Sequence, residues 1–197
     1  MARVSDVIPL SGHFRIFVEI YYNCCIYIAW RNKMGKKTVQ VYYGTGKGKS
    51  SAAVGQCIRA ASQGLSVIII QFLKGKDSDE FSFLDKLEPD IKFFSFEKAE
   101  QSYDSLPASQ KKEERQNILN GFNFARKVVD TGECDVLVLD EVLGLLDLDI
   151  ITTEDIINLI NMRDDYCRLV LTGRNLPEGL MAYADVVSKI DLEKDNR

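Results

Sequence analysis

Two long apolar runs constrain the fold of this chain more than any other feature. Residues 65–73 read LSVIIIQFL, and residues 134–142 read CDVLVLDEV. Neither run alternates apolar with polar residues, and continuous runs of this kind are typical of strands that are buried on both faces of a parallel sheet. Such a sheet needs a layer of helices on each face, so the segments between its strands must supply those helices.

The rest of the chain after Met34 meets this requirement. Shorter strand-like segments bring the candidate strands to six, and they lie at residues 38–43, 91–96, 167–174 and 185–190. Segments with helical character separate most of the strands, at residues 49–63, 110–130, 154–161 and 177–183. Strands that alternate with helices predict right-handed crossovers and a mainly parallel sheet. We therefore expect an α/β fold with five to six strands and helices on both faces.

A loop rich in glycine and lysine joins the first candidate strand to the first candidate helix. Its GKS triplet matches the end of the phosphate-loop pattern G-x-x-x-x-G-K-[ST], although Tyr43 replaces the first glycine. Glycines let backbone N–H groups turn toward an anion, and the helix that follows presents its positive end. A flexible basic surface loop is the alternative, but the position between a strand and a helix favours a nucleotide and a P-loop, RecA-like fold. The candidate binding residues are Gly44, Thr45, Gly46, Lys47, Gly48, Lys49, Ser50 and Ser51.

Charged side chains also follow two later strands, at the edge where parallel sheets bind ligands. Asp140 and Glu141 end an apolar strand in the manner of a Walker B motif, whose carboxylate holds Mg²⁺ directly or through water. Arg174, in the segment LTGR, ends another strand and can neutralise phosphate charge. The alternative for Arg174 is an ion pair with a local acid. We include Arg174 among the candidate nucleotide-binding residues.

The loop itself supplies the remaining chemistry. Lys49 can reach phosphate oxygens, Lys47 adds a second cation, and the hydroxyl of Ser50 suits Mg²⁺. The sequence therefore predicts catalytic roles for Lys49, Lys47 and Glu141. It predicts metal ligands at Ser50, Glu141 and Asp140.

Composition excludes several other kinds of site. His13 is the only histidine among the 197 residues, so the chain beyond it cannot build a Ser-His-Asp triad, a Cys-His pair or an HExxH zinc site. The net charge of −4 argues against a nucleic-acid partner. The 5 cysteines form no CxxC pair, and we expect reduced thiols in a cytoplasmic protein.

The first 33 residues do not resemble the rest of the chain. Residues 14–30 read FRIFVEIYYNCCIYIAW, but polar residues interrupt this run, and it is shorter than the roughly 20 residues of a membrane-spanning helix. We expect no membrane attachment. The segment is either an extension upstream of a natural start at Met34 or an accessory strand or helix. The expected division is an atypical extension at residues 1–33 and a nucleotide-binding domain at residues 34–197.

Four segments together resemble the ATP:corrinoid adenosyltransferases of the CobA/BtuR type. The family's loop has the form G-[NT]-G-K-G-K-[TS]-[TS] and also lacks the usual first glycine, which accounts for Tyr43. The resemblance extends from about residue 38 to residue 192. The segments are VYYGTGKGKSSAAVGQCIRA (41–60), GLSVIIIQFLKG (64–75), VLVLDEVLGLL (136–146) and LVLTGRNLPEGLMAYADVVSKI (169–190).

The resemblance implies an enzyme that transfers the 5′-deoxyadenosyl group of ATP to Co(I) of a reduced corrinoid and releases triphosphate. It implies ATP and corrinoid as substrates, Mg²⁺ or Mn²⁺ as the metal, an electron-donating flavoprotein as a partner, and a homodimer. By position, residues 44–51 match the family's ATP loop, and Ser50 and Glu141 match its metal-binding hydroxyl and carboxylate. Glu80 matches an acidic position after the second strand. The nucleotide is expected to lie reversed relative to ordinary P-loop enzymes, with C5′ toward the corrinoid.

The chain departs from the family near the expected corrinoid. Many members carry a Phe-x-Trp segment after the third strand, where this chain reads FSFEKAEQSYDSL, and its only tryptophan is Trp30. Phe94, Phe96 and Tyr103 are the candidate replacements, although packing in the core is favoured for at least one of these rings. Two other functions stay open on these grounds: a P-loop ATPase or kinase, and an ATP-binding module without transfer activity.

Deletion of residues 1–33 should leave a soluble domain that binds ATP, because every predicted strand and motif lies after Met34. Size-exclusion chromatography and equilibrium binding of a fluorescent ATP analogue test this prediction. An insoluble truncation would show that the segment is structural.

Overall fold

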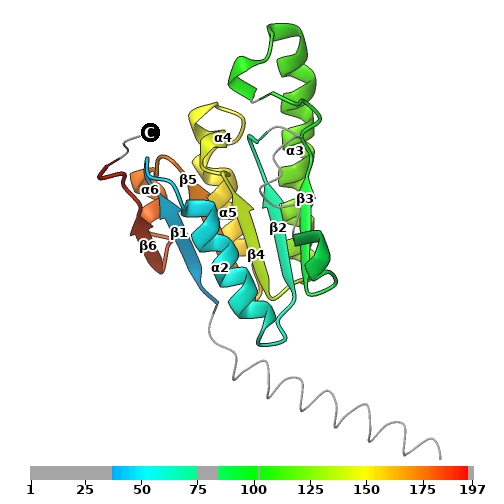
Figure 1. Cartoon of the computed structure of the whole chain (residues 1–197), viewed down its shortest axis with the longest axis vertical. Coiled ribbons are helices and arrows are strands. Elements are labelled where there is room, and N and C mark those ends of the chain that lie inside the picture. Colours follow the sequence, from blue (N-terminus) through cyan, green and yellow to red (C-terminus); the bar gives the residue numbers. More distant parts are fainter. Residues whose placement is uncertain (1–36, 75–83, 102, 195–197) are drawn as a thin grey trace, which may run out of the picture. The chain divides into compact units, whose positions relative to one another are not determined.

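A computed structural model describes residues 37–74, 84–101 and 103–194. Within these residues the chain forms one sheet of 6 strands in the order β3-β2-β4-β5-β1-β6, and every neighbouring pair is parallel (Figure 1). The strands are β1 (Val39–Tyr43), β2 (Val67–Gln71), β3 (Ile91–Ser95), β4 (Val136–Asp140), β5 (Arg168–Gly173) and β6 (Val186–Lys189). All six predicted strands are confirmed. The segment 1–33 lies outside the described residues.

Helices alternate with the strands as expected. The α-helices are α2 (Lys49–Ala61), α3 (Ala108–Thr131), α4 (Gly144–Asp147), α5 (Thr153–Met162) and α6 (Glu178–Met181). Two 3₁₀ turns, η3 (Leu84–Leu87) and η4 (Tyr103–Ser105), flank β3. The short helix α4 was not predicted, because its residues continue the apolar character of the strand before them and give no separate helical period. No helix among the described residues is long and apolar enough to cross a membrane.

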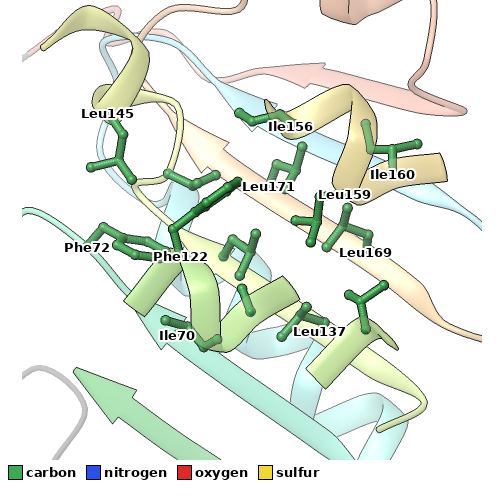
Figure 2. Close-up of a cluster of buried hydrophobic side chains, with 14 of the residues drawn as sticks. Ile70, Phe72, Phe122, Leu137, Leu145, Ile156, Leu159, Ile160, Leu169 and Leu171 are labelled. Carbon is green, nitrogen blue, oxygen red and sulfur yellow. The ribbon is translucent and has the colours of Figure 1, made fainter. Parts of the chain in front are cut away.

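The two faces of the sheet carry separate apolar layers. Helix α2 packs on one face against β1, β4 and β5, and α3 and α5 pack together on the other, as Figure 1 shows. Successive strand residues point to opposite faces. The core under α3 and α5 accordingly takes alternate residues, among them Ile70, Leu137, Leu169 and Leu171 (Figure 2). Burial on both faces explains why β2 and β4 read as continuous apolar runs.

The parallel arrangement fixes where the loops meet. All six strands point the same way, so the segments after β1, β2, β4 and β5 leave the sheet at one edge. Strand β5 lies between β1 and β4, so the glycine-lysine loop after β1 and the acidic pair at the end of β4 flank the end of β5. The fold therefore brings the predicted motifs to one edge.

A capping box begins α5. Thr152 donates its backbone N–H to Oδ2 of Asp155 at 2.9 Å, and Oγ1 of Thr152 accepts from the N–H of Asp155 at 3.2 Å. These bonds satisfy polar groups that the first turn of a helix leaves open. The hydrogen bonds from the backbone and the hydroxyl of Thr152 lower the pKa of Asp155.

Thr152→Ala should lower the free energy of unfolding by about 1 kcal/mol, because alanine cannot cap α5. Urea denaturation at neutral pH measures this change. Thr153→Ala is the matched control and should leave stability unchanged or slightly higher, since this residue lies inside the helix and alanine is the better helix former. Equal losses in the two variants would contradict the assignment of the cap.

Candidate active site

The glycine-lysine loop is held by backbone bonds from two neighbouring segments. Gly44 donates its N–H to the carbonyl of Arg174 at 3.0 Å, and Gly46 donates its N–H to the carbonyl of Ile190 at 2.8 Å. Gly44 has φ +121, and a Cβ at this position would lie 2.4 Å from the carbonyl oxygen of Ile190. Only glycine fits so close to another backbone. These two N–H groups are therefore engaged within the protein and are not free to bind a phosphate.

The loop ends at the N-terminus of α2. Gly48 is the cap residue, with φ 103 and no side-chain hydrogen bond to the helix, and the first turn contains no acidic residue. The N–H groups of this turn form the positive end of the helix and are therefore open to an anion. Lys49 donates from Nζ to the carbonyl of Gly46 at 2.9 Å, so its ammonium is held over the loop. Thr45, Lys47 and Ser51 are exposed.

A buried carboxylate joins three strand ends. Asp140 is 1% exposed, and its Oδ1 accepts from the hydroxyl of Thr172 at 2.7 Å. Its Oδ2 accepts from Nε2 of Gln71 at 3.2 Å and lies 3.8 Å from Nζ of Lys74. Gln71 ends β2 and Thr172 lies in β5, so Asp140 ties β4 to both neighbours. Both of its oxygens have partners within the protein.

Glu141 is the carboxylate that faces the cations. Its backbone has φ 59, and its N–H donates to Oγ1 of Thr172 at 2.7 Å. Burial, followed by the charge of Asp140, raises the pKa of Glu141, while Lys49, Lys74 and Arg174 oppose this rise. The positive charges of three side chains, from the segments after three different strands, therefore act on one carboxylate. This arrangement brings together Lys49, Glu141 and Arg174, which the sequence placed in one site.

Lys74 is a site residue that the sequence analysis missed. It follows β2 at the same sheet edge as the other motifs, and its Nζ approaches Asp140 from there. A signal existed, because a lysine directly after a buried strand is positioned like Arg174 after β5. Glu80, predicted nearby, lies outside the described residues.

The aromatic side chains at the end of β3 and just after it pack against α3. The ring of Phe94 lies 4.9 Å from that of Phe124 in an edge-to-face contact, and the ring of Phe96 lies 5.4 Å from it. Both rings are half-buried and extend the core under α3. The expectation that at least one of them packs in the core is therefore confirmed. Tyr103 also packs at the margin of that core, below the ammonium of Lys111.

The model of the ATP:corrinoid adenosyltransferase family BtuR/CobO/CobP matches residues 35–196. The chain belongs to this family. It is 26% identical to the corrinoid adenosyltransferase of Escherichia coli K12, over 76% of this chain and 74% of that protein, and 28% identical to that of Pseudomonas aeruginosa, over 78% and 74%. An uncharacterized protein of Nostoc sp. is 26% identical, and the match spans 81% of this chain but only 48% of that relative.

The fold has a solved counterpart outside the adenosyltransferase family. A KaiC-like protein from Pyrococcus horikoshii superposes with a TM-score of 0.52 and 19% identity, over 81% of this chain and 73% of that one. At this identity the likeness concerns the fold alone. It agrees with the predicted α/β architecture, and the family match confirms the resemblance drawn from the sequence.

Lys49→Ala should lower turnover at least about a hundredfold, because it removes a charge-stabilising donor from the phosphate loop. Steady-state kinetics with saturating ATP measure the loss. Lys127→Ala, which removes an exposed cation from α3 far along the chain from the loop, is the control and should leave turnover near wild type. Near-normal turnover in Lys49→Ala would count against its role.

Proposed function

We propose that this protein transfers the 5′-deoxyadenosyl group of ATP to Co(I) of a reduced corrinoid and releases triphosphate. The observation that carries the proposal is the set of cations at one sheet edge, beside a loop with the family's glycine pattern. Lys49 lies over that loop, Lys74 lies 3.8 Å from the carboxylate of Asp140, and Arg174 directly follows β5. Three cations from different loops suit a highly charged leaving group better than a single phosphate. Membership of the adenosyltransferase family supports the same reaction.

The reaction transfers the whole 5′-deoxyadenosyl group, which becomes bonded to cobalt through C5′. The electron pair of Co(I) attacks C5′ of the ribose, a Co–C bond forms, and the C5′–O bond breaks. The leaving triphosphate takes that electron pair, and cobalt passes formally from Co(I) to Co(III). Co(I) is already a strong nucleophile, so no side chain needs to act as a base, which suits a domain without histidine beyond residue 13. The protein must hold the triphosphate and aim C5′.

The residues of the loop support binding of the triphosphate. The open N-terminus of α2, with Lys49 held over it, attracts the anion. Arg174 and Lys74 add positive charge from the ends of β5 and β2. Their charges counteract the effect of the negative charge of Asp140 on Glu141. Lys47 is exposed in the loop and supplies a further cation. Together these groups stabilise the charge that builds on the leaving oxygen.

Mg²⁺ or Mn²⁺ fits this site as a partner of the phosphates. Ser50 lies in the first turn of α2, and Glu141 is half-buried and is influenced by nearby cations. The hydroxyl of Ser50 and the carboxylate of Glu141 are therefore the candidate protein ligands of the metal. The described residues hold no cluster of three metal-ligating side chains, which suits a metal that takes its other ligands from phosphate and water. When bound, the ion would neutralise phosphate charge. Because Asp140 has partners on both oxygens, we assign it a supporting role beside Glu141.

Two assembly features complete the proposal. Co(I) must be supplied by reduction, and an electron-donating flavoprotein is the class of partner that the family resemblance implies. The same resemblance implies a homodimer. Phe94, near the end of β3, and Phe96, just after it, are both half-buried and would border the corrinoid from their exposed edges.

The test is an anaerobic incubation of the protein with ATP, Mg²⁺ and chemically reduced corrinoid. We expect inorganic triphosphate and a light-sensitive alkylcobalamin spectrum in equal amounts. Orthophosphate with no change at cobalt would support a P-loop ATPase or kinase instead. Tight ATP binding without any product would support a binding module.

A further inference from the structure

Lys74 reaches the site from a turn with an unusual backbone. Strand β2 ends at Gln71, and the N–H of Phe72 still donates to the carbonyl of Asp140 at 2.9 Å. The next residue, Leu73, has φ 60, in the left-handed region that side chains other than glycine rarely adopt. The chain turns there and carries Lys74 to the carboxylate of Asp140. A leucine in this conformation persists only where its surroundings hold it.

The carboxyl of Glu97 holds this turn. The backbone N–H of Leu73 donates to Oε1 of Glu97, and the amide of Lys74 also interacts with this carboxyl. Glu97 lies just after β3, the neighbour of β2 at the edge of the sheet, and is 8% exposed. The contact therefore spans two adjacent strand ends and is shielded from water.

The side chain of Leu73 has a matching space. A Cβ on Gly144 would lie 2.6 Å from Cδ1 of Leu73, so the absence of a side chain at the start of α4 admits the leucine. Glu97 therefore binds the backbone of the turn, and Gly144 leaves room for its side chain.

Glu97 is also unusual for a buried acid, because its second oxygen, Oε2, is buried without a hydrogen-bond partner among the described residues. Burial raises the pKa of Glu97 to about 8, the charge of Glu114 adds to the rise, and the amides of Leu73 and Lys74 oppose it. At neutral pH the side chain is therefore mostly a neutral acid. A neutral carboxyl still has an oxygen that accepts hydrogen bonds from the two backbone N–H groups. The side-chain carbonyl of glutamine can accept them in the same way.

We propose that Glu97 is a positioning residue for the transfer reaction: it holds the turn at Leu73 so that the ammonium of Lys74 lies beside Asp140 and Glu141, where the triphosphate binds. The inference rests on the proposed function for the identity of the anion. Glu97 acts through Lys74 and does not itself reach the substrate.

Glu114 provides a matched control within the same neighbourhood. It is 4% exposed on α3, its Oε1 accepts from the N–H groups of Lys98 and Ala99, and its Oε2 accepts from Asn117. These bonds hold the segment after Glu97 and do not involve the Leu73 turn. Removal of a hydrogen bond at Glu114 should therefore affect stability and leave the position of Lys74 unchanged.

The experiment is a double-mutant cycle between Glu97→Ala and Lys74→Met, with inorganic triphosphate as the probe in calorimetric titration and with kcat and KM measured in parallel. Each single variant should weaken triphosphate binding about tenfold, the cost of one charge-assisted contact. In the Lys74→Met background, Glu97→Ala should add less than about a twofold further loss, since residues that act through one contact are not additive. Glu97→Gln should stay within about threefold of wild type, and Glu114→Gln should bind triphosphate like wild type.

Two results would overturn the proposal. In the first, the losses of triphosphate affinity in the two single variants multiply in the double variant. In the second, the Glu97→Ala protein has a lowered Tm but an unchanged affinity for triphosphate. If Glu97→Ala does not fold, Glu97→Asp replaces it in the cycle, because the carboxyl is kept but withdrawn from the Leu73 amide. A wild-type protein that binds triphosphate yet transfers no adenosyl group would contradict the proposed function. The double-mutant cycle could still be measured in that case, because it uses the affinity for triphosphate.

Discussion

The site depends on one buried carboxylate. Asp140 is almost fully excluded from water, and it accepts hydrogen bonds from Thr172 and Gln71 on the two flanking strands. A buried acceptor that loses a partner costs about 1–3 kcal/mol, so the three strand ends are held in one arrangement. The hydroxyl of Thr172 also accepts from the amide of Glu141, which extends the network to the next residue. Strand ends that are fixed in this way give the loops a rigid base.

The electrostatics of this sheet edge follow from the position of Asp140 at its centre. Burial, and after it the charge of the adjacent Asp140, raises the pKa of Glu141. Lysines and an arginine from three loops balance these charges, and the uncapped helix α2 adds a positive end. This balance of charges supports the proposed binding of a polyanion at this edge. Chemistry at carbon needs no further acid or base from the chain.

Much of this architecture was predictable from the sequence, and the rest depends on long-range contacts. Continuous apolar runs identify β2 and β4 because burial on both faces demands them. The glycine-lysine loop and the acidic pair carry their chemistry in their residue types. The role of Lys74 depends instead on Glu97, more than twenty positions away, in a polar stretch that reads as an ordinary loop. A left-handed leucine has no sequence signal, since the conformation is imposed by its neighbours.

The hydrogen bond between Gly46 and Ile190 links the glycine-lysine loop to the edge of the sheet. Among the described residues, strand β6 pairs with β1 alone, and the carbonyl of Ile190 just after β6 accepts a hydrogen bond from the N–H of Gly46. Edge strands open more readily than central ones, so transient fraying of β6 would release the loop from its support. Hydrogen exchange at the amide of Gly46 would then report the opening of β6. Through this hydrogen bond, the stability of β6 determines how well the glycine-lysine loop is ordered before a nucleotide binds.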